Sequence, residues 1–152
     1  MKRLLAPILF ALFLPACGAS AVRVQATAIE ASAIVLHTTG DIITEASYRD
    51  AIATCPDHSP AMCLDPVSAR WEPVDLALDG ARAALGAWYA ADLVAHRLGG
   101  DEYLRAALEG AARFARVYVE IVALAARLHV EIPALPPVVT MWLDSLSQPV
   151  AP

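Results

Sequence analysis

Apolar residues recur at helical spacing along most of the chain. Over residues 19–53 an apolar residue returns every seven positions, which places the row on one stripe of a helix. The row consists of Val22, Ile29, Leu36 and Ile43. A row of small residues, which would let a neighbouring helix approach closely, runs beside it at Ala26, Ala33 and Gly40. The pattern predicts a long helix over 19–53, with a kink or break near 38–41 where poor helix formers cluster.

Two further stretches carry the helical pattern, and a glycine pair joins them. Residues 72–98 predict a helix with Pro73 in its first turn, where a missing N–H costs nothing, and Gly99-Gly100 ends it. Asp101 is a candidate cap for a third helix over 102–130, which ends before a cluster of prolines. The expected core stripes are Leu78, Ala81, Leu85, Trp88 and Ala95 in the first of these helices, and Leu104, Leu108, Ala111, Ala115, Tyr118, Val122, Ala125 and Leu128 in the second.

These elements predict an all-α fold. A two-residue connection forces the second and third helices into an antiparallel hairpin, and helices of about 30 residues span about 45 Å. We therefore expect an elongated three-helix bundle. A loop over 54–70, which contains three prolines, separates the first two helices, and a short amphipathic helix over 138–146 follows the third.

The N-terminus has the pattern of an export signal. Two basic residues precede an apolar run over 4–14 that is too short to cross a bilayer. Leu14 and Ala16, placed before Cys17, resemble the cleavage region of bacterial lipoprotein signal peptides. The resemblance covers residues 1–18 only. The alternative is an ordinary signal peptide, cut near Ala16 or Ala19.

The lipoprotein resemblance implies how the mature chain is held. Residues 1–16 would be removed, leaving one helical domain over 17–152 with lipid on Cys17, and several acyl chains anchor a protein stably to a membrane. Gly18, rather than an acidic residue, would direct the protein to the periplasmic face of the outer membrane. The chain carries a net charge of −5, and loss of the basic leader makes the mature part more acidic. This balance argues against nucleic-acid binding.

The other two cysteines enclose a short proline-containing loop. Cys55 and Cys63 form an even pair once Cys17 carries lipid, and in an oxidising compartment such a pair predicts a disulfide. The alternative is a metal site that uses Cys55, His58 and Cys63, although a fourth ligand is not evident. We expect the disulfide, with no metal and no cofactor.

The remaining polar residues predict little chemistry. Asp92 and His96 lie four apart on one helix face, a spacing that suits a metal or acid–base pair but is more typical of a surface pair. The tryptophans and tyrosines could line an apolar pocket, although aromatic residues at helical spacing are more often core. These are Trp71, Trp88, Trp142, Tyr89, Tyr103 and Tyr118. No phosphate loop, nucleophile elbow or HExxH motif is present.

The sequence therefore predicts a non-enzymatic, envelope-anchored helical lipoprotein. We expect it to act as a structural or protein-interaction module, with a protein partner or a second copy packed on the apolar row of the first helix. The alternative function is binding of a small apolar ligand or lipid between the helices. A metal-dependent enzyme and an envelope lipoprotein encoded by a phage or mobile element are further alternatives.

Overall fold

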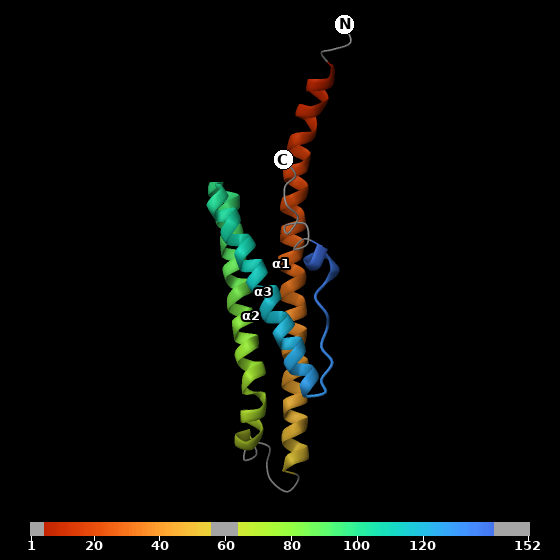
Figure 1. Cartoon of the computed structure of the whole chain (residues 1–152), viewed down its shortest axis with the longest axis vertical. Helices are drawn as coiled ribbons and strands as arrows, with labels where there is room; N and C mark the ends of the chain where they lie inside the picture. Colours follow the sequence, from red (N-terminus) through yellow and green to blue (C-terminus); the bar gives the residue numbers. More distant parts are fainter. Residues whose placement is uncertain (1–4, 56–63, 142–152) are drawn as a thin grey trace.

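Three long helices form the protein, as the computed structural model shows (Figure 1). It describes the backbone of residues 5–55 and 64–141 and the side chains within 25–55, 67–100 and 102–141. The helices are α1 (Leu5–Thr54), α2 (Leu64–Leu98) and α3 (Asp101–Arg127). A short helix follows over 137–141, and the described residues contain no strand. The all-α prediction and the order of its elements are confirmed.

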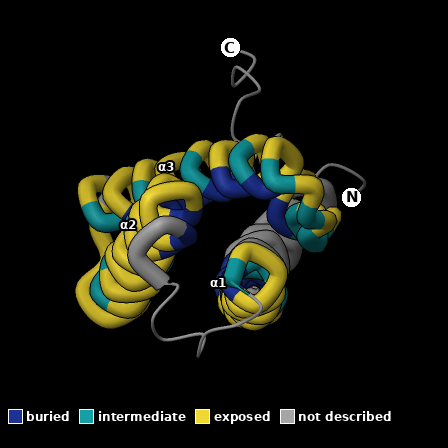
Figure 2. The backbone as a smooth tube through the Cα atoms, turned by 90° about the horizontal axis from the view of Figure 1, so that it is seen from below, coloured by how far each residue is buried: buried dark blue, intermediate teal, exposed yellow. Residues whose placement is uncertain are grey.

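The helices pack as a hairpin laid against a single long rod. α2 and α3 run antiparallel, and α3 crosses from α2 towards the lower half of α1 (Figures 1 and 2). One continuous core joins all three helices with the segment that follows α3. Burial of this shared apolar face, more than the propensity of any one helix, is what stabilises such long helices.

α1 is longer and more regular than its sequence pattern predicts. It runs without a break from Leu5 to Thr54. No break occurs near 38–41, and threonine hydroxyls in that region bond to carbonyls of the preceding turn. Thr38 Oγ1 donates to the Ile34 carbonyl at 3.0 Å, and Thr44 Oγ1 donates to the Gly40 carbonyl at 2.8 Å.

The core face of α1 is partly the predicted one. Ile29, Leu36 and Ile43 are buried, which confirms the described part of the apolar row. Ala26 and Ala33 are exposed, so the predicted row of small residues is wrong for these two positions. A polar row with the same seven-residue spacing is buried instead, at Gln25, Ser32 and Thr39.

α2 begins well before its predicted start, so part of the expected loop is helical. Pro66 lies in the first turn, where no backbone donor is lost. Val67, Trp71 and Val74 share the buried face, and their burial favours extending the helix through this region. Pro73 therefore lies inside the helix rather than in its first turn, and it leaves one backbone carbonyl without its helical donor.

The start of α2 is tied to the end of α1 by one carboxylate. Both oxygens of Asp50 accept from Nη1 of Arg70 at 2.8 Å, and Oδ2 also accepts from Trp71 Nε1 at 2.9 Å. This contact orients the two helices on either side of the chain reversal. It is more than a surface pair, because the Trp71 ring is buried.

Both ends of α3 differ from the prediction, and in each case the φ angle of one residue explains the difference. Gly100, at φ 107°, is the N-cap, and no side chain caps the helix, so the expected Asp101 cap is wrong. The helix ends at Arg127 rather than near 130, because His129 adopts φ 59°. The His129 N–H donates to the Ala126 carbonyl and the Val130 N–H to the Ala125 carbonyl, which is the Schellman pattern.

The core face of α3 is shifted from the predicted stripe. Ala111, Tyr118 and Ala125 are buried as expected, whereas Leu104 and Val122 are exposed by 46% and 38%. Phe114 and Ile121, absent from the predicted stripe, are fully buried. Aromatic rings in tilted contact fill the centre, with ring centroids 6.3 Å apart for Trp88 and Phe114 and 5.9 Å apart for Phe114 and Tyr118.

The chain then turns back along the bundle. Residues 128–136, which we call the return segment, pass from the lower end of α3 up beside α1 (Figure 1). Its apolar side chains pack on the core, and Tyr118 Oη donates to the Pro133 carbonyl at 2.7 Å. The short helix begins at residue 137, close to its predicted start, and its predicted remainder lies outside the described residues.

Candidate functional site

The cysteines chosen from sequence fall mostly outside what the structure describes. The backbone of Cys17 is helical within α1, and its side chain is not described. Cys55 follows α1, with its N–H donating to the Ala51 carbonyl at 3.1 Å. His58 and Cys63 lie outside the described residues. Lipid on Cys17 and the Cys55–Cys63 pair therefore stay predictions. Among the described residues, no group of three or more histidine, cysteine or acidic side chains could hold a metal.

Asp92 and His96 form the candidate site. The Asp92 side chain is buried, with 9% exposed, whereas His96 lies at the surface with 35% of its side chain exposed. His96 Nδ1 lies 2.8 Å from the Asp92 carbonyl oxygen and 3.4 Å from Asp92 Oδ1. Because a carbonyl oxygen only accepts, Nδ1 carries the hydrogen, and in the neutral ring Nε2 is an acceptor. The interpretation of these two residues as a surface pair was wrong for the aspartate.

The Asp92 carboxylate is held in an unfavourable setting. Its Oδ1 is buried and accepts no hydrogen bond. Burial raises the pKa of this carboxyl above its ordinary value, and the nearby His96 opposes that rise in part. A buried carboxylate with so little compensation destabilises a fold, and such costs are characteristic of residues retained for function.

A pocket of about 370 Å³ opens between α1 and α2 beside this pair. α1 contributes Ala26, Ile29 and Glu30, and α2 contributes Tyr89, Asp92, Leu93 and His96. The opposing residues come together because the two helices run antiparallel. Mostly apolar walls with a few polar groups are the usual construction of a small-molecule site.

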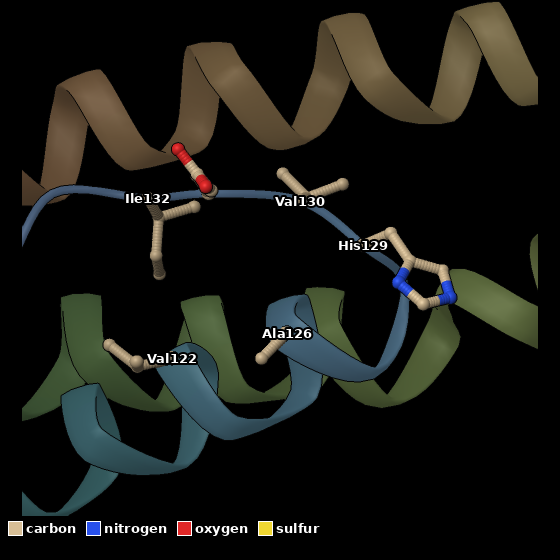
Figure 3. A pocket seen from close by; sticks show the side chains of 6 residues that line it. Val122, Ala126, His129, Val130 and Ile132 are labelled. Carbon is tan, nitrogen blue, oxygen red and sulfur yellow. The ribbon is translucent and has the colours of Figure 1, made fainter.

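A second pocket, of about 590 Å³, lies between α3 and the return segment (Figure 3). Val122 and Ala126 line it from the helix, and Val130 and Ile132 from the return segment. His129 stands at one end, where its unusual backbone conformation turns the chain. The sequence did not indicate this pocket, because it depends on the path of a segment without regular periodicity.

The aromatic residues do not form the pocket that their sequence allowed. Trp88 and Tyr118 are fully buried in the packed core, and Trp71 is nearly so. Tyr103 is partly buried beside Gly100, and Tyr89 is 52% exposed. Of the described tryptophans and tyrosines in this set, only Tyr89 lines the α1–α2 pocket. Trp142 lies outside the described residues. Core packing is therefore the main role of this set.

No family model matches the chain, and neither the curated proteins nor the solved structures include a detectable relative. Within the described residues, no helix is sufficiently long and apolar to span a bilayer.

Proposed function

We propose that this chain is a bacterial envelope lipoprotein, anchored through lipid on Cys17, whose helical domain acts by contact with another protein. The support for the anchor is the signal-like sequence of residues 1–18, and Gly18 favours the outer membrane. The support for protein contact is an exposed apolar surface on α3. The Cys55–Cys63 disulfide, which export would favour, belongs to the same proposal.

Because α1 is continuous, a lipid on Cys17 would lie close to the helical bundle. The first described buried side chain, Gln25, follows Cys17 by eight residues of unbroken helix. At 1.5 Å per residue this is about 12 Å. The bundle would therefore stand directly at the membrane surface, without the flexible linker that would let it reach distant partners.

The single observation that carries the contact function is an apolar stripe on α3 beside its core face. Val119 is 62% exposed, and three of its four neighbours at helical spacing are apolar, the exception being Arg116. The stripe consists of Leu104, Leu108, Ala115, Val119, Val122 and Ala126. It leads into the pocket of Figure 3, because Val122 and Ala126 belong to both. The described part of the apolar row of α1, in contrast, packs in the core of the chain itself.

Metabolic labelling tests the anchor. Cells expressing the full chain and given radiolabelled palmitate should label the wild type and the Cys55→Ser variant, whereas Cys17→Ser should carry no label. Globomycin should block processing of the wild type. Equal labelling of Cys17→Ser, or an unlabelled wild type that is cut near Ala16 or Ala19, would contradict the lipid anchor.

Site-specific photo-crosslinking tests the contact surface. A photoreactive amino acid at Val119 should give a discrete adduct in intact cells, and the same residue at the exposed Arg113, outside the stripe on α3, should not. Val119→Asp should then weaken the adduct formed from position 122. No adduct at 119, or equal adducts at 119 and 113, would reject this surface.

A second candidate function is binding of a small, largely apolar ligand, and the α1–α2 pocket favours it. Ala26, Ile29 and Leu93 supply apolar walls in a space of about 370 Å³, which is within the size range of ligand sites. A phenylalanine at the exposed position 26 would fill this space from α1. Binding of apolar probes to the wild type and not to Ala26→Phe is the expected result.

A further inference from the structure

The α1–α2 pocket combines apolar walls with negative charge. Asp92 projects from α2, and Glu30 lies on the α1 side of the same pocket. The Asp92 side chain is 9% exposed, whereas Glu30 is exposed. The pocket therefore has one carboxylate within the protein and one at its edge, on opposite helices.

No described side chain gives the buried carboxylate a full counter-charge. Its nearest cationic candidate is His96, whose Nδ1 hydrogen is directed to the Asp92 main-chain carbonyl at 2.8 Å. The contact from Nδ1 to Oδ1 is longer, at 3.4 Å, and Oδ1 has no hydrogen bond. Among the side chains that the structure describes, no lysine or arginine lines the pocket. A charged group in this setting would be stabilised by a cation supplied from outside.

The aromatic ring at the edge points to the same chemistry. Tyr89 lines the pocket one helical turn from Asp92 and is half exposed. An aromatic face attracts cations, and proteins use aromatic rings to recognise organic ammonium groups. The two carboxylates disfavour an anion by like-charge repulsion. A bare metal ion is disfavoured by the lack of a sufficient ligand group among the described residues.

We propose that the α1–α2 pocket binds a small organic ammonium ion, with its charged nitrogen at Asp92 and its hydrocarbon part against Ile29 and Leu93. The inference rests on the ligand-binding candidate function above and specifies the class of ligand. Glu30 adds long-range attraction at the entrance, and Tyr89 contacts the cation there.

Calorimetric titration of the full chain with three matched probes tests the proposal. Hexylammonium, hexanol and hexanoate share one hydrocarbon chain and differ in charge. We expect hexylammonium to bind most tightly and hexanoate least, at neutral pH and low salt. The full chain with its proposed lipid anchor is titrated in detergent. Titrations of the same detergent without protein correct for partition of each probe into micelles.

Variants separate recognition of the charge from binding of the hydrocarbon. Asp92→Asn keeps the shape of the side chain and should weaken hexylammonium binding about tenfold or more, while hexanol binding stays within about twofold. Asp79→Asn, at an exposed carboxylate on α2 outside this pocket, should leave both unchanged. Ala26→Phe, at an exposed position, should abolish binding of both probes without relying on substitution of a buried residue.

The outcomes distinguish the two levels of the proposal. If hexanol binds as tightly as hexylammonium, or if Asp92→Asn binds hexylammonium like the wild type, ammonium recognition is wrong but an apolar ligand site stands. If no probe binds, or if Ala26→Phe binds them all unchanged, the ligand-binding function fails as well.

Discussion

Thr39 and Tyr118, 79 residues apart in the chain, share a buried hydrogen bond of 2.8 Å between their hydroxyl oxygens. The Tyr118 hydroxyl also donates to the Pro133 carbonyl at 2.7 Å. Since a carbonyl only accepts and a phenol has one hydrogen, Thr39 must be the donor to Tyr118. One phenol oxygen thus connects α1, α3 and the return segment.

Replacing this phenol should cost more than one ordinary hydrogen bond. Tyr118→Phe leaves the Thr39 hydroxyl and the Pro133 carbonyl without this partner, and we expect a loss of about 1–3 kcal/mol in the free energy of unfolding. Urea denaturation measures it. Tyr89→Phe, at a half-exposed ring, should change stability by less than about 0.5 kcal/mol. An equal effect of the two substitutions would mean that the buried network contributes nothing.

Gly110 marks the closest approach of α2 and α3. A Cβ added there would lie 2.8 Å from Trp88 Cα, so the backbones would have to separate. We expect Gly110→Ala to lower the free energy of unfolding by about 1–3 kcal/mol through overpacking. Gly86→Ala, where a Cβ meets nothing within 4 Å, should raise it by about 0.5–1 kcal/mol. Thermal unfolding of both variants checks this, and a stabilising Gly110→Ala would refute the close approach.

The sequence predicted the helices well where periodicity alone decides the outcome. Ile29, Leu36 and Ile43 repeat at a fixed spacing, and their burial follows from that spacing. On α3 the apolar arc is wider than the face that α1 and α2 cover. Periodicity could not show which edge of that arc stays exposed, and so Val122 was expected inside and Phe114 was overlooked.

The candidate site was less accessible to sequence reasoning. Four-residue spacing places Asp92 and His96 on one face of a helix, but it does not say whether that face turns towards a neighbour. The return segment is rich in proline and has no helical period, so its path could not be predicted. The sequence did carry a signal for the burial of Asp92. This residue follows Leu78 and Leu85 at the same seven-residue spacing.

His129 is strained by its place in the turn after α3. A side chain at φ 59° meets steric resistance that glycine does not. His129→Gly should therefore raise the free energy of unfolding by about 0.5–1 kcal/mol, after allowance for the greater freedom of glycine in the unfolded chain. His37→Gly makes the same change at an exposed site inside α1 and should lower stability by about 1 kcal/mol. Chemical denaturation of both proteins gives the signs, and the same sign for both would contradict this account.

The cysteine pair predicts a redox-dependent stability. The exported protein should be two hydrogens lighter than its reduced form, with Cys55 and Cys63 in one crosslinked peptide. Reduction should lower the free energy of unfolding by about 2–3 kcal/mol, because the closed loop is short. Free thiols at both positions in the exported protein would rule out the pair.

Asp92 should make stability depend on pH in a particular direction. Burial raises the pKa of Asp92 in the folded chain above the ordinary value of 3.8. In the pH interval between 3.8 and this raised pKa, the folded state therefore binds more of the proton than the unfolded state does. The ionised form therefore costs stability at neutral pH, and this cost disappears as the pH falls through that interval.

Asp92→Asn removes the titrating group and keeps its shape. The variant should be more stable than the wild type at pH 7, and its advantage should shrink as the pH approaches 3.8. Urea denaturation across this range measures the difference, in which the carboxyls common to both proteins largely cancel. Asp79→Asn, at an exposed carboxylate, should change stability by less than about 0.5 kcal/mol at either end. A difference between Asp92→Asn and wild type that does not vary with pH would show that the buried carboxylate is not the source of the cost.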